Sequence, residues 1–299
     1  MSRYLFPLLL TALLPVFPAL ADSSSPLLAA YYDRLMAIVG DVAYGWQGAD
    51  RPQRIHSGAV QVGVGRHAYY VLTAEGRLLR FRGDLDQPKA LITSVARFSA
   101  GRTGVLAILS NGALWWLPAD GEKAKIADGV VTAAVGDSAN YYVTETGALF
   151  VKGSAHRGQY GDGRLTETAT FVQTATNVAR ITAHTGHAIL LTRTGNVFGT
   201  GGNIYGPVGR HGLGDKAVRW SRILSGAKAV ATGSSHTLAV LPDGKLMAWG
   251  ADYGPEPVAI MAGVTAVAAG SSATIALKAD GSLWQWTRSE HPRRVLELP

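Results

Sequence analysis

The chain has 299 residues, a formal net charge of +7 at pH 7 and no cysteine. This length allows one or two domains, and the lack of cysteine excludes disulfide bonds, thiol catalysis and zinc–thiolate sites. Charged residues make up only 16% of the sequence, whereas 36 residues are glycine. Such a composition is typical of short strands joined by tight turns rather than of exposed helices.

The first 21 residues have the features of a secretory signal peptide. Arg3 supplies a positive charge, an apolar run extends to about Leu20, and Ala19 and Ala21 provide the small residues that a signal peptidase reads. The alternative is a retained membrane anchor, but the run is short and contains three prolines. We therefore predict removal of residues 1–21, no membrane span in the mature chain, and a periplasmic or secreted location.

The basic residues are spread along the chain. Removal of residues 1–21 takes away only Arg3, which leaves 27 basic residues against 21 acidic ones, or about +6. A nucleic-acid-binding protein needs such charge gathered into a stripe, whereas only short pairs such as Arg293-Arg294 occur here. We therefore expect no nucleic-acid ligand and a solvated basic surface; the alternative is attraction to an acidic partner or to an anionic envelope surface.

An internal repeat determines the predicted architecture. Residues 230–250 and 267–286 both give a small-residue strand, a turn, an apolar strand, an Asp-Gly turn and an aromatic strand, in that order. The glycine between the apolar and aromatic strands recurs, with spacings of 36, 36, 35, 48, 49 and 37, at Gly40, Gly76, Gly112, Gly147, Gly195, Gly244 and Gly281. Eleven positions before the last six of these stand Gly65, Gly101, Gly136, His184, Gly233 and Gly270.

The repeat predicts a propeller. Dipeptides such as Asn111-Gly112 and Asp243-Gly244 supply the positive φ angles of a two-residue hairpin. The strand around Leu238 is apolar on both faces, so it is expected to lie between two sheets. Because one unit cannot bury its own faces, the units must stack, and a closed ring leaves only short edges. We therefore predict an all-β fold, with residues 22–299 forming a single seven-bladed β-propeller.

The ends of the chain are predicted to close the ring. The first copy, residues 35–46, shows no clear inner strand, whereas residues 292–298 match the segment 257–260 that follows the sixth hairpin. We therefore expect the C-terminal segment to complete the first blade, so that the N- and C-terminal segments pair. The alternative is seven tandem blades with a loose tail.

The repeat resembles that of the regulator of chromosome condensation family. Residues 233–250 match its strand pattern, and residues 153–163 and 201–209 match its Gly-rich loop. This resemblance covers nearly all of the mature chain and implies a disc whose loops bind other proteins. One branch acts on a small GTPase and on chromatin. A secreted bacterial branch, which includes a propeller-type β-lactamase inhibitory protein, agrees better with the signal peptide, although no interaction motif of either branch is matched.

No group of residues with catalytic spacing stands out. His187 and His236 occupy the same position in two repeats, so they are expected to fill turns between blades rather than to bind a metal. Asp162, Asp215 and Asp252 lie in turn contexts, where aspartate forms local hydrogen bonds. We therefore predict a non-enzymatic protein without catalytic residues, metal or cofactor.

The two longest spacings reveal two extended loops, which carry the candidate binding residues. Loops on a rigid scaffold are common binding sites, and Trp, Tyr and Arg dominate interface energies. Because the loops belong to adjacent repeats, they are predicted to form one patch; the alternative is a purely structural role. The candidate binding residues are His156, Arg157, Tyr160, Asp162, Tyr205, Arg210, His211, Trp220 and Arg222.

These features favour an exported monomer that binds another protein in the periplasm or outside the cell, as an inhibitor, an immunity protein or a docking protein. A rigid face loses little conformational freedom on binding. Two alternatives stay open. An envelope glycan or polysaccharide binder would need Tyr160, Tyr205 and Trp220 to line one groove. A lyase or hydrolase would need titratable side chains clustered at one mouth of the central channel.

Overall fold

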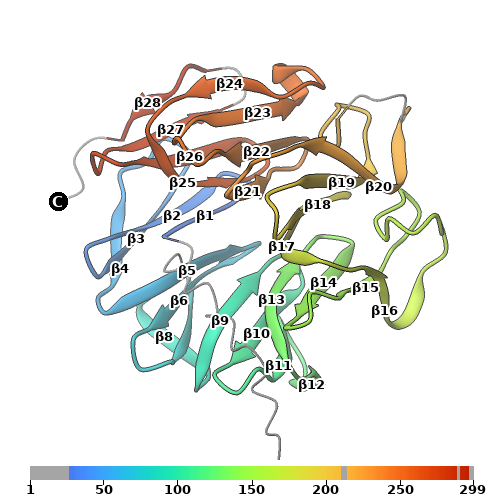
Figure 1. Cartoon of the computed structure of the whole chain (residues 1–299). Helices are drawn as coiled ribbons and strands as arrows, with labels where there is room; N and C mark the ends of the chain where they lie inside the picture. The colour runs from blue at the N-terminus through green and yellow to red at the C-terminus, as the bar shows by residue number, and fades with distance from the viewer. Residues whose placement is uncertain (1–26, 210–213, 288–289, 296–299) are drawn as a thin grey trace, which may run out of the picture.

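A computed structural model describes residues 27–209, 214–287 and 290–295. Seven four-stranded antiparallel sheets form the blades of a ring, as predicted (Figure 1). The only helical element in these ranges is the three-residue 3-10 helix η1 (Ala251–Tyr253), and no helix there is long and apolar enough to cross a membrane. The predicted signal peptide, residues 1–21, lies outside the described residues.

Each blade is made of four consecutive strands, numbered in chain order. The first four blades comprise β1 (Leu28–Tyr31), β2 (Arg34–Val39), β3 (Val42–Gln47) and β4 (Gln53–His56); β5 (Ala59–Gly65), β6 (Ala68–Thr73), β7 (Leu78–Arg82) and β8 (Asp84–Ile92); β9 (Val95–Ala100), β10 (Gly104–Leu109), β11 (Leu114–Pro118) and β12 (Ala124–Ala127); and β13 (Val130–Val135), β14 (Ala139–Thr144), β15 (Leu149–Gly153) and β16 (Thr168–Ala175). The last three comprise β17 (Val178–Ala183), β18 (His187–Thr192), β19 (Val197–Gly202) and β20 (Lys216–Leu224); β21 (Ala229–Thr232), β22 (His236–Val240), β23 (Leu246–Gly250) and β24 (Val258–Met261); and β25 (Val264–Ala269), β26 (Ala273–Lys278), β27 (Leu283–Thr287) and β28 (Arg293–Arg294).

The seven hairpin glycines predicted from the repeat all have positive φ. Their φ values lie between 62° at Gly40 and 83° at Gly147, a region in which a side chain is strained. The glycines eleven positions earlier have a different role, because the next blade approaches them closely. A Cβ atom on Gly233 would lie 2.5 Å from the carbonyl oxygen of Gly270, and one on Gly65 would lie 2.8 Å from that of Gly101.

The core lies between the blades, as the apolar character of both strand faces predicted. All six residues of β6 and all six of β18 are buried. Between blades 4 and 5, for example, Tyr141 and Val143 pack with Ile181 and Leu190. Each fully buried Leu or Val side chain contributes about 1.5–3 kcal/mol, so the ring is stabilised by contacts that no single blade can make.

The predicted pairing of the N- and C-terminal segments is wrong. Arg293 and Arg294 of β28 pair with β27 of their own blade, and the first blade is completed by β1, so the blades are seven tandem units. The physical reason is that residues 28–31 form a small-residue inner strand like those of the other blades. This strand ends in Tyr31 rather than glycine, so it does not show the repeat pattern.

Blades 1 and 7 instead meet through side chains, and Figure 1 shows β1 and β2 beside β25 and β26. Leu35 and Tyr44 pack in one cluster with Ile275. Nε1 of Trp46 donates to Oε1 of Gln285 at 2.9 Å, and Nε2 of Gln285 donates to the carbonyl of Gly48 at 2.6 Å. The ring is thus closed by a packed interface with two specific hydrogen bonds.

Candidate binding face

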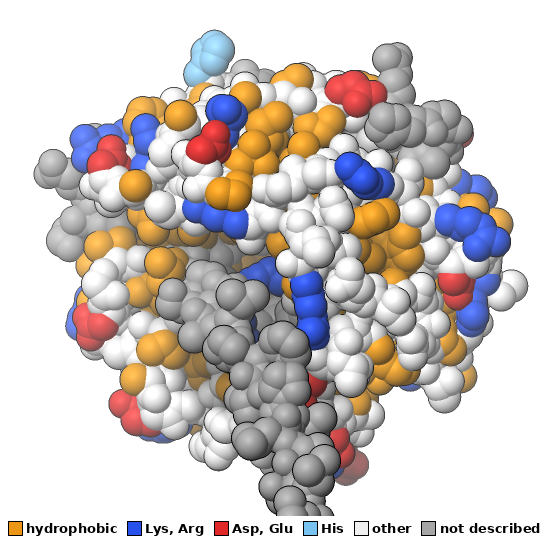
Figure 2. All heavy atoms as spheres, viewed as in Figure 1, with side chains coloured by type: hydrophobic (Ala, Val, Ile, Leu, Met, Phe, Trp, Pro, Cys, Tyr) orange, Lys and Arg blue, Asp and Glu red, His pale blue; other side chains and the backbone are white. Residues whose placement is uncertain are grey.

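Both extended loops lie on one face of the ring, which we call the loop face. Because consecutive strands are antiparallel, the turn after the first strand of each blade and the loop after its third strand are at the same end. The loop face therefore carries residues 154–167 and residues 203–209 and 214–215, together with the seven short turns around the channel. On the face in view in Figure 2, basic side chains are interspersed with acidic and apolar ones.

The first loop is held by hydrogen bonds to the fold. Thr200 of the next blade donates its hydroxyl to the carbonyl of Gly158 at 2.7 Å. The Tyr160 hydroxyl donates to the carbonyl of Gly153 at 2.8 Å and accepts the N–H of Thr168 at 3.1 Å. Tyr160 has no exposed surface, so its predicted role as a contact residue is wrong. It is part of the core and maintains the loop conformation.

The second loop is fixed in a similar way. Asn203 is buried and donates its Nδ2 to the carbonyl of Gly209 at 2.9 Å, while its Oδ1 accepts the N–H of Val208 at 3.2 Å. The carbonyl of Pro207 accepts hydrogen bonds from the Trp249 indole and the Thr237 hydroxyl of the next blade, both at 2.8 Å. The described part of this loop is therefore organised before any partner binds.

A cleft of about 580 Å³ lies where the two loops meet. It brings together three of the predicted binding residues, His156 and Arg157 from the first loop and Tyr205 from the second. Two short turns of blades 5 and 6 supply the rest of its floor. Its lining consists of His156, Arg157, Thr185, Gly186, His187, Gly202, Ile204, Tyr205, Pro207, Asp215, Lys216, Ser234 and Ser235.

Ile204 and Tyr205 give the cleft an exposed apolar rim. Ile204 is 68% exposed and Tyr205 is 61% exposed, the highest values among the large hydrophobic side chains that the structure describes. Their backbone is held in place, since the carbonyl of Tyr205 accepts the N–H of Ala251 in the next blade at 2.7 Å. Exposed apolar side chains on a fixed loop are typical of interaction surfaces.

The other predicted residues that the structure describes do not line this cleft. Asp162 forms an ion pair with Arg164 at 2.7 Å. Trp220 packs over Gly161, where a Cβ atom would lie 2.5 Å from its Nε1, and exposed Arg222 donates to the Ser225 hydroxyl at 2.7 Å. Arg210 and His211 lie outside the described residues.

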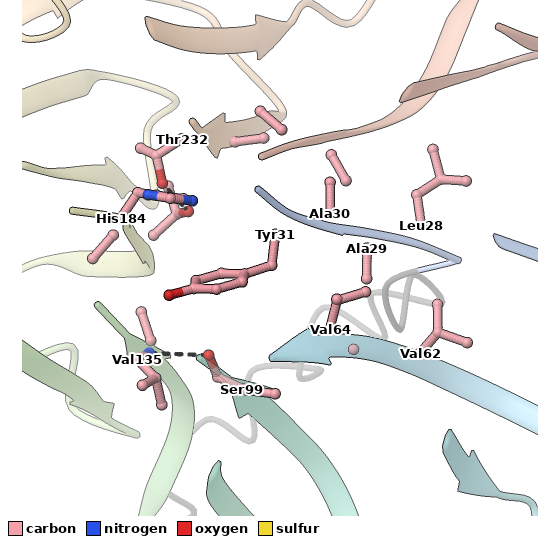
Figure 3. Close-up of a pocket in the computed structure, with 18 of the residues that line it drawn as sticks. Leu28, Ala29, Ala30, Tyr31, Val62, Val64, Ser99, Val135, His184 and Thr232 are labelled. Carbon is pink, nitrogen blue, oxygen red and sulfur yellow. Dashed lines mark hydrogen bonds between the residues drawn. The ribbon is translucent and has the colours of Figure 1, made fainter. Parts of the chain in front are cut away.

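A second group of side chains, which the sequence analysis missed, lies at the mouth of the central channel. The channel, of about 230 Å³, is lined by the inner strands of all seven blades. Figure 3 shows Tyr31 extending from β1 toward His184. The Tyr31 hydroxyl donates to Oδ1 of Asp137 at 2.6 Å. Burial, this hydrogen bond and the charge of Asp137 raise the pKa of Tyr31, so the phenol stays protonated.

This group places titratable side chains together at one mouth of the channel, as a lyase or hydrolase would need. Its members, however, form hydrogen bonds to one another. The Tyr31 proton is directed at Asp137, whose Oδ2 also accepts the Thr185 hydroxyl at 3.3 Å. Nδ1 of His184 accepts the backbone N–H of Thr185 at 3.0 Å. The arrangement is therefore that of a brace between blades 1, 4 and 5.

The buried histidines fill spaces between blades, as predicted. Nε2 of His187 lies 3.4 Å from the Thr237 hydroxyl, and Nε2 of His236 lies 3.1 Å from the Thr274 hydroxyl, so each imidazole contacts the next blade. Burial, with smaller effects of His184 and His236, lowers the pKa of His187 to about 3. Across the described ranges, no three His, Asp or Glu side chains gather closely enough to hold a metal ion.

Comparison with known proteins agrees with this architecture. Residues 227–253 match the regulator of chromosome condensation (RCC1) repeat, and no curated protein sequence matches the chain. Yeast RCC1 (Prp20), solved bound to Kap60, is 17% identical over 81% of this chain and 74% of its own, with a TM-score of 0.70. Human WBSCR16 is 15% identical over 83% and 84%, with a TM-score of 0.72. The CRINKLY ectodomain of the Arabidopsis thaliana receptor kinase ACR4 is 14% identical over 87% and 94%, with a TM-score of 0.59. The TM-scores indicate a shared fold, and at identities this low the likeness is one of fold alone.

Proposed function

Because the chain is an RCC1-like seven-bladed β-propeller, we propose that it is a non-enzymatic binding protein whose loop face docks another protein. The cleft between the two loops is the observation that carries this proposal. It combines an apolar rim with exposed cationic side chains, and the described parts of both loops are held by hydrogen bonds. Yeast RCC1, a propeller of the same fold, was solved in a complex with the protein Kap60.

The proposed setting is the periplasm or the outside of the cell, where the protein would act as a monomeric inhibitor, immunity protein or docking protein. The signal-peptide features of residues 1–21 support this part of the proposal. The test is to express the chain in a bacterium, fractionate the cells and sequence the N-terminus of the product. We expect a periplasmic or secreted protein that begins at Asp22. A product that keeps residues 1–21 in the cytoplasm would contradict export.

The binding role is tested by affinity capture from periplasmic and secreted fractions, followed by mass spectrometry. We expect one stoichiometric protein partner, and we expect the Tyr205→Ala variant to capture at least about tenfold less of it, because Tyr205 is an exposed aromatic anchor. Arg77→Ala is the matched control, since Arg77 is an exposed residue in a hairpin turn at the opposite face. Capture that is equal for the wild type and Tyr205→Ala would show that the loop face is not the docking surface.

A further inference from the structure

The charges of the cleft between the loops are unbalanced. Among the described residues of its lining, Arg157 and Lys216 stand beside one carboxylate, that of Asp215, and His156 adds a further nitrogen donor. All four residues are exposed. Among the described residues, neither Arg157 nor Lys216 has an ion-pair partner. The described lining therefore presents to a partner two cations that form no ion pair, against one carboxylate.

Arg157 is positioned by the two glycines beneath it. A Cβ atom on Gly186 would lie 3.2 Å from Cδ of Arg157, and one on Gly202 would lie 3.3 Å from the same atom. The backbone N–H of Arg157 donates to Oε1 of buried Gln159 at 2.8 Å. The stem of this side chain thus rests on the floor of the cleft, so its planar fork loses little freedom when it binds a carboxylate through two hydrogen bonds.

The surroundings of these cations fit a protein better than a polysaccharide. Sugar rings stack on rows of exposed aromatic side chains, but Tyr160 is fully buried and Trp220 packs over Gly161, outside the cleft. Among the described residues of the lining, Tyr205 is then the one exposed Phe, Tyr or Trp side chain, and its neighbour is Ile204. In the cleft, a cation therefore stands beside an aliphatic and an aromatic side chain. This surface is complementary to a partner segment in which an acidic residue is next to an apolar one.

We propose that the cleft binds an Asp or Glu side chain from a loop of the partner protein, with an adjacent apolar residue packed on Ile204 and Tyr205. Arg157 donates two hydrogen bonds to the carboxylate, and Lys216 provides a second positive charge. This inference rests on the proposed function of the loop face as a protein-docking surface, and it specifies the chemistry of the residue that is docked.

The experiment is selection of short random peptides, displayed on phage, against the full chain. We expect the enriched peptides to share an Asp or Glu next to an apolar residue. Calorimetry with one enriched synthetic peptide should give an affinity that falls at least about tenfold in Arg157→Ala. Arg157→Lys should give an intermediate affinity, because a lysine keeps the charge without the fork. Arg77→Ala on the opposite face should bind as the wild type does.

Three results would overturn the proposal. The enriched peptides could lack an acidic residue, they could bind Arg157→Ala as tightly as the wild type, or the cleft could take polygalacturonate in an Arg157-dependent manner while no peptide is enriched. Failure of this proposal can be distinguished from failure of the docking function. If affinity capture yields a partner through Tyr205 while acidic peptides are not selected, the loop face docks a protein but the carboxylate assignment is wrong. If capture does not depend on Tyr205, the docking function of the loop face is wrong.

Discussion

The rings of Tyr31 and His184 stack across the mouth of the channel, with centroids 5.4 Å apart and an interplanar angle of 22°. Tyr31 belongs to blade 1 and His184 to blade 5, yet both occupy the turn position that is glycine in the other five blades. Asp137 of blade 4 accepts the Tyr31 hydroxyl, so three blades that are not all neighbours are joined. The two exceptions to the repeat pattern are therefore partners of each other.

Removal of the Tyr31 hydroxyl should weaken this brace without emptying the channel mouth. In Tyr31→Phe the ring stack is kept, but Asp137 loses its shortest hydrogen bond. We expect the free energy of unfolding to fall by about 1–2 kcal/mol, measured by urea denaturation. Tyr205→Phe, which alters an exposed hydroxyl, should have no such effect. If Tyr31→Phe is as stable as the wild type, the hydrogen bond does not brace the ring.

Neighbouring blades approach each other closely at the glycines in the turn after the first strand of a blade. These glycines should therefore not tolerate any side chain. A Cβ atom on Gly270 would lie 2.3 Å from the carbonyl oxygen of Tyr32, so Gly270→Ala should push blades 7 and 1 apart. We expect a loss of about 2 kcal/mol or more of unfolding free energy, measured as a lower urea midpoint. Gly202→Ala is the control, because the nearest atom to its Cβ would be Cδ of the exposed Arg157 side chain, at 3.3 Å, and the nearest backbone atom would be 3.6 Å away. Equal stabilities of the two variants would contradict the close-approach explanation.

Acid should destabilise the protein through His187. Its pKa is lowered by burial from an ordinary value near 6.5 to about 3 in the folded chain, so between these two values the unfolded chain binds more protons than the folded one. The contribution of His187 to stability is therefore fully present above about pH 6.5 and is lost as the pH is lowered toward 3, at up to about 1.4 kcal/mol per pH unit.

The measurement is urea denaturation at a series of pH values between about 7 and 4. His187→Gln should reduce the slope of stability against pH, and His67→Gln, in an exposed turn, controls for the loss of a histidine as such. An unchanged slope in His187→Gln would show that another group is responsible for the acid sensitivity.

The interface that closes the ring should depend on one amide. Gln285 is buried and bonds both the Trp46 indole and the Gly48 carbonyl of blade 1. Gln285→Ala leaves both groups without this partner, so we expect a loss of about 2–6 kcal/mol, from one buried and one partly buried group at roughly 1–3 kcal/mol each. Thermal unfolding followed by circular dichroism measures it. Gln47→Ala, an exposed glutamine on β3, should unfold at nearly the wild-type temperature, and similar losses for both variants would contradict a specific role for Gln285.

The repeat was readable from the sequence because its turns impose a backbone requirement that few residues meet. A positive φ at Gly112 or Gly244 restricts the residue type, so the register of the hairpins was visible without any tertiary information. The missed strand β1 illustrates the limit, because Leu28 to Tyr31 meets no such requirement and acquires its role from packing against blade 7.

The site was predicted less completely, for a related reason. The loops could be located because they lengthen the repeat, and this was enough to find His156, Arg157 and Tyr205. Whether a loop side chain points outward depends on partners distant in sequence. Tyr160 is buried where the carbonyl of Gly153 accepts a hydrogen bond from its hydroxyl and the N–H of Thr168 donates one to it, and no local pattern encodes that arrangement.

Closure without a shared strand has a consequence for the order of folding. Each blade is one continuous segment, so each can form its sheet as soon as its own residues are available. The apolar side chains of blade 1, such as Leu35 and Tyr44, are covered by Ile275 and Leu283 of the last blade. If the chain emerges from a membrane with its N-terminus first, this surface stays uncovered until nearly all of the chain has followed. The partly emerged chain is thus most prone to aggregation just before its last blade docks on its first.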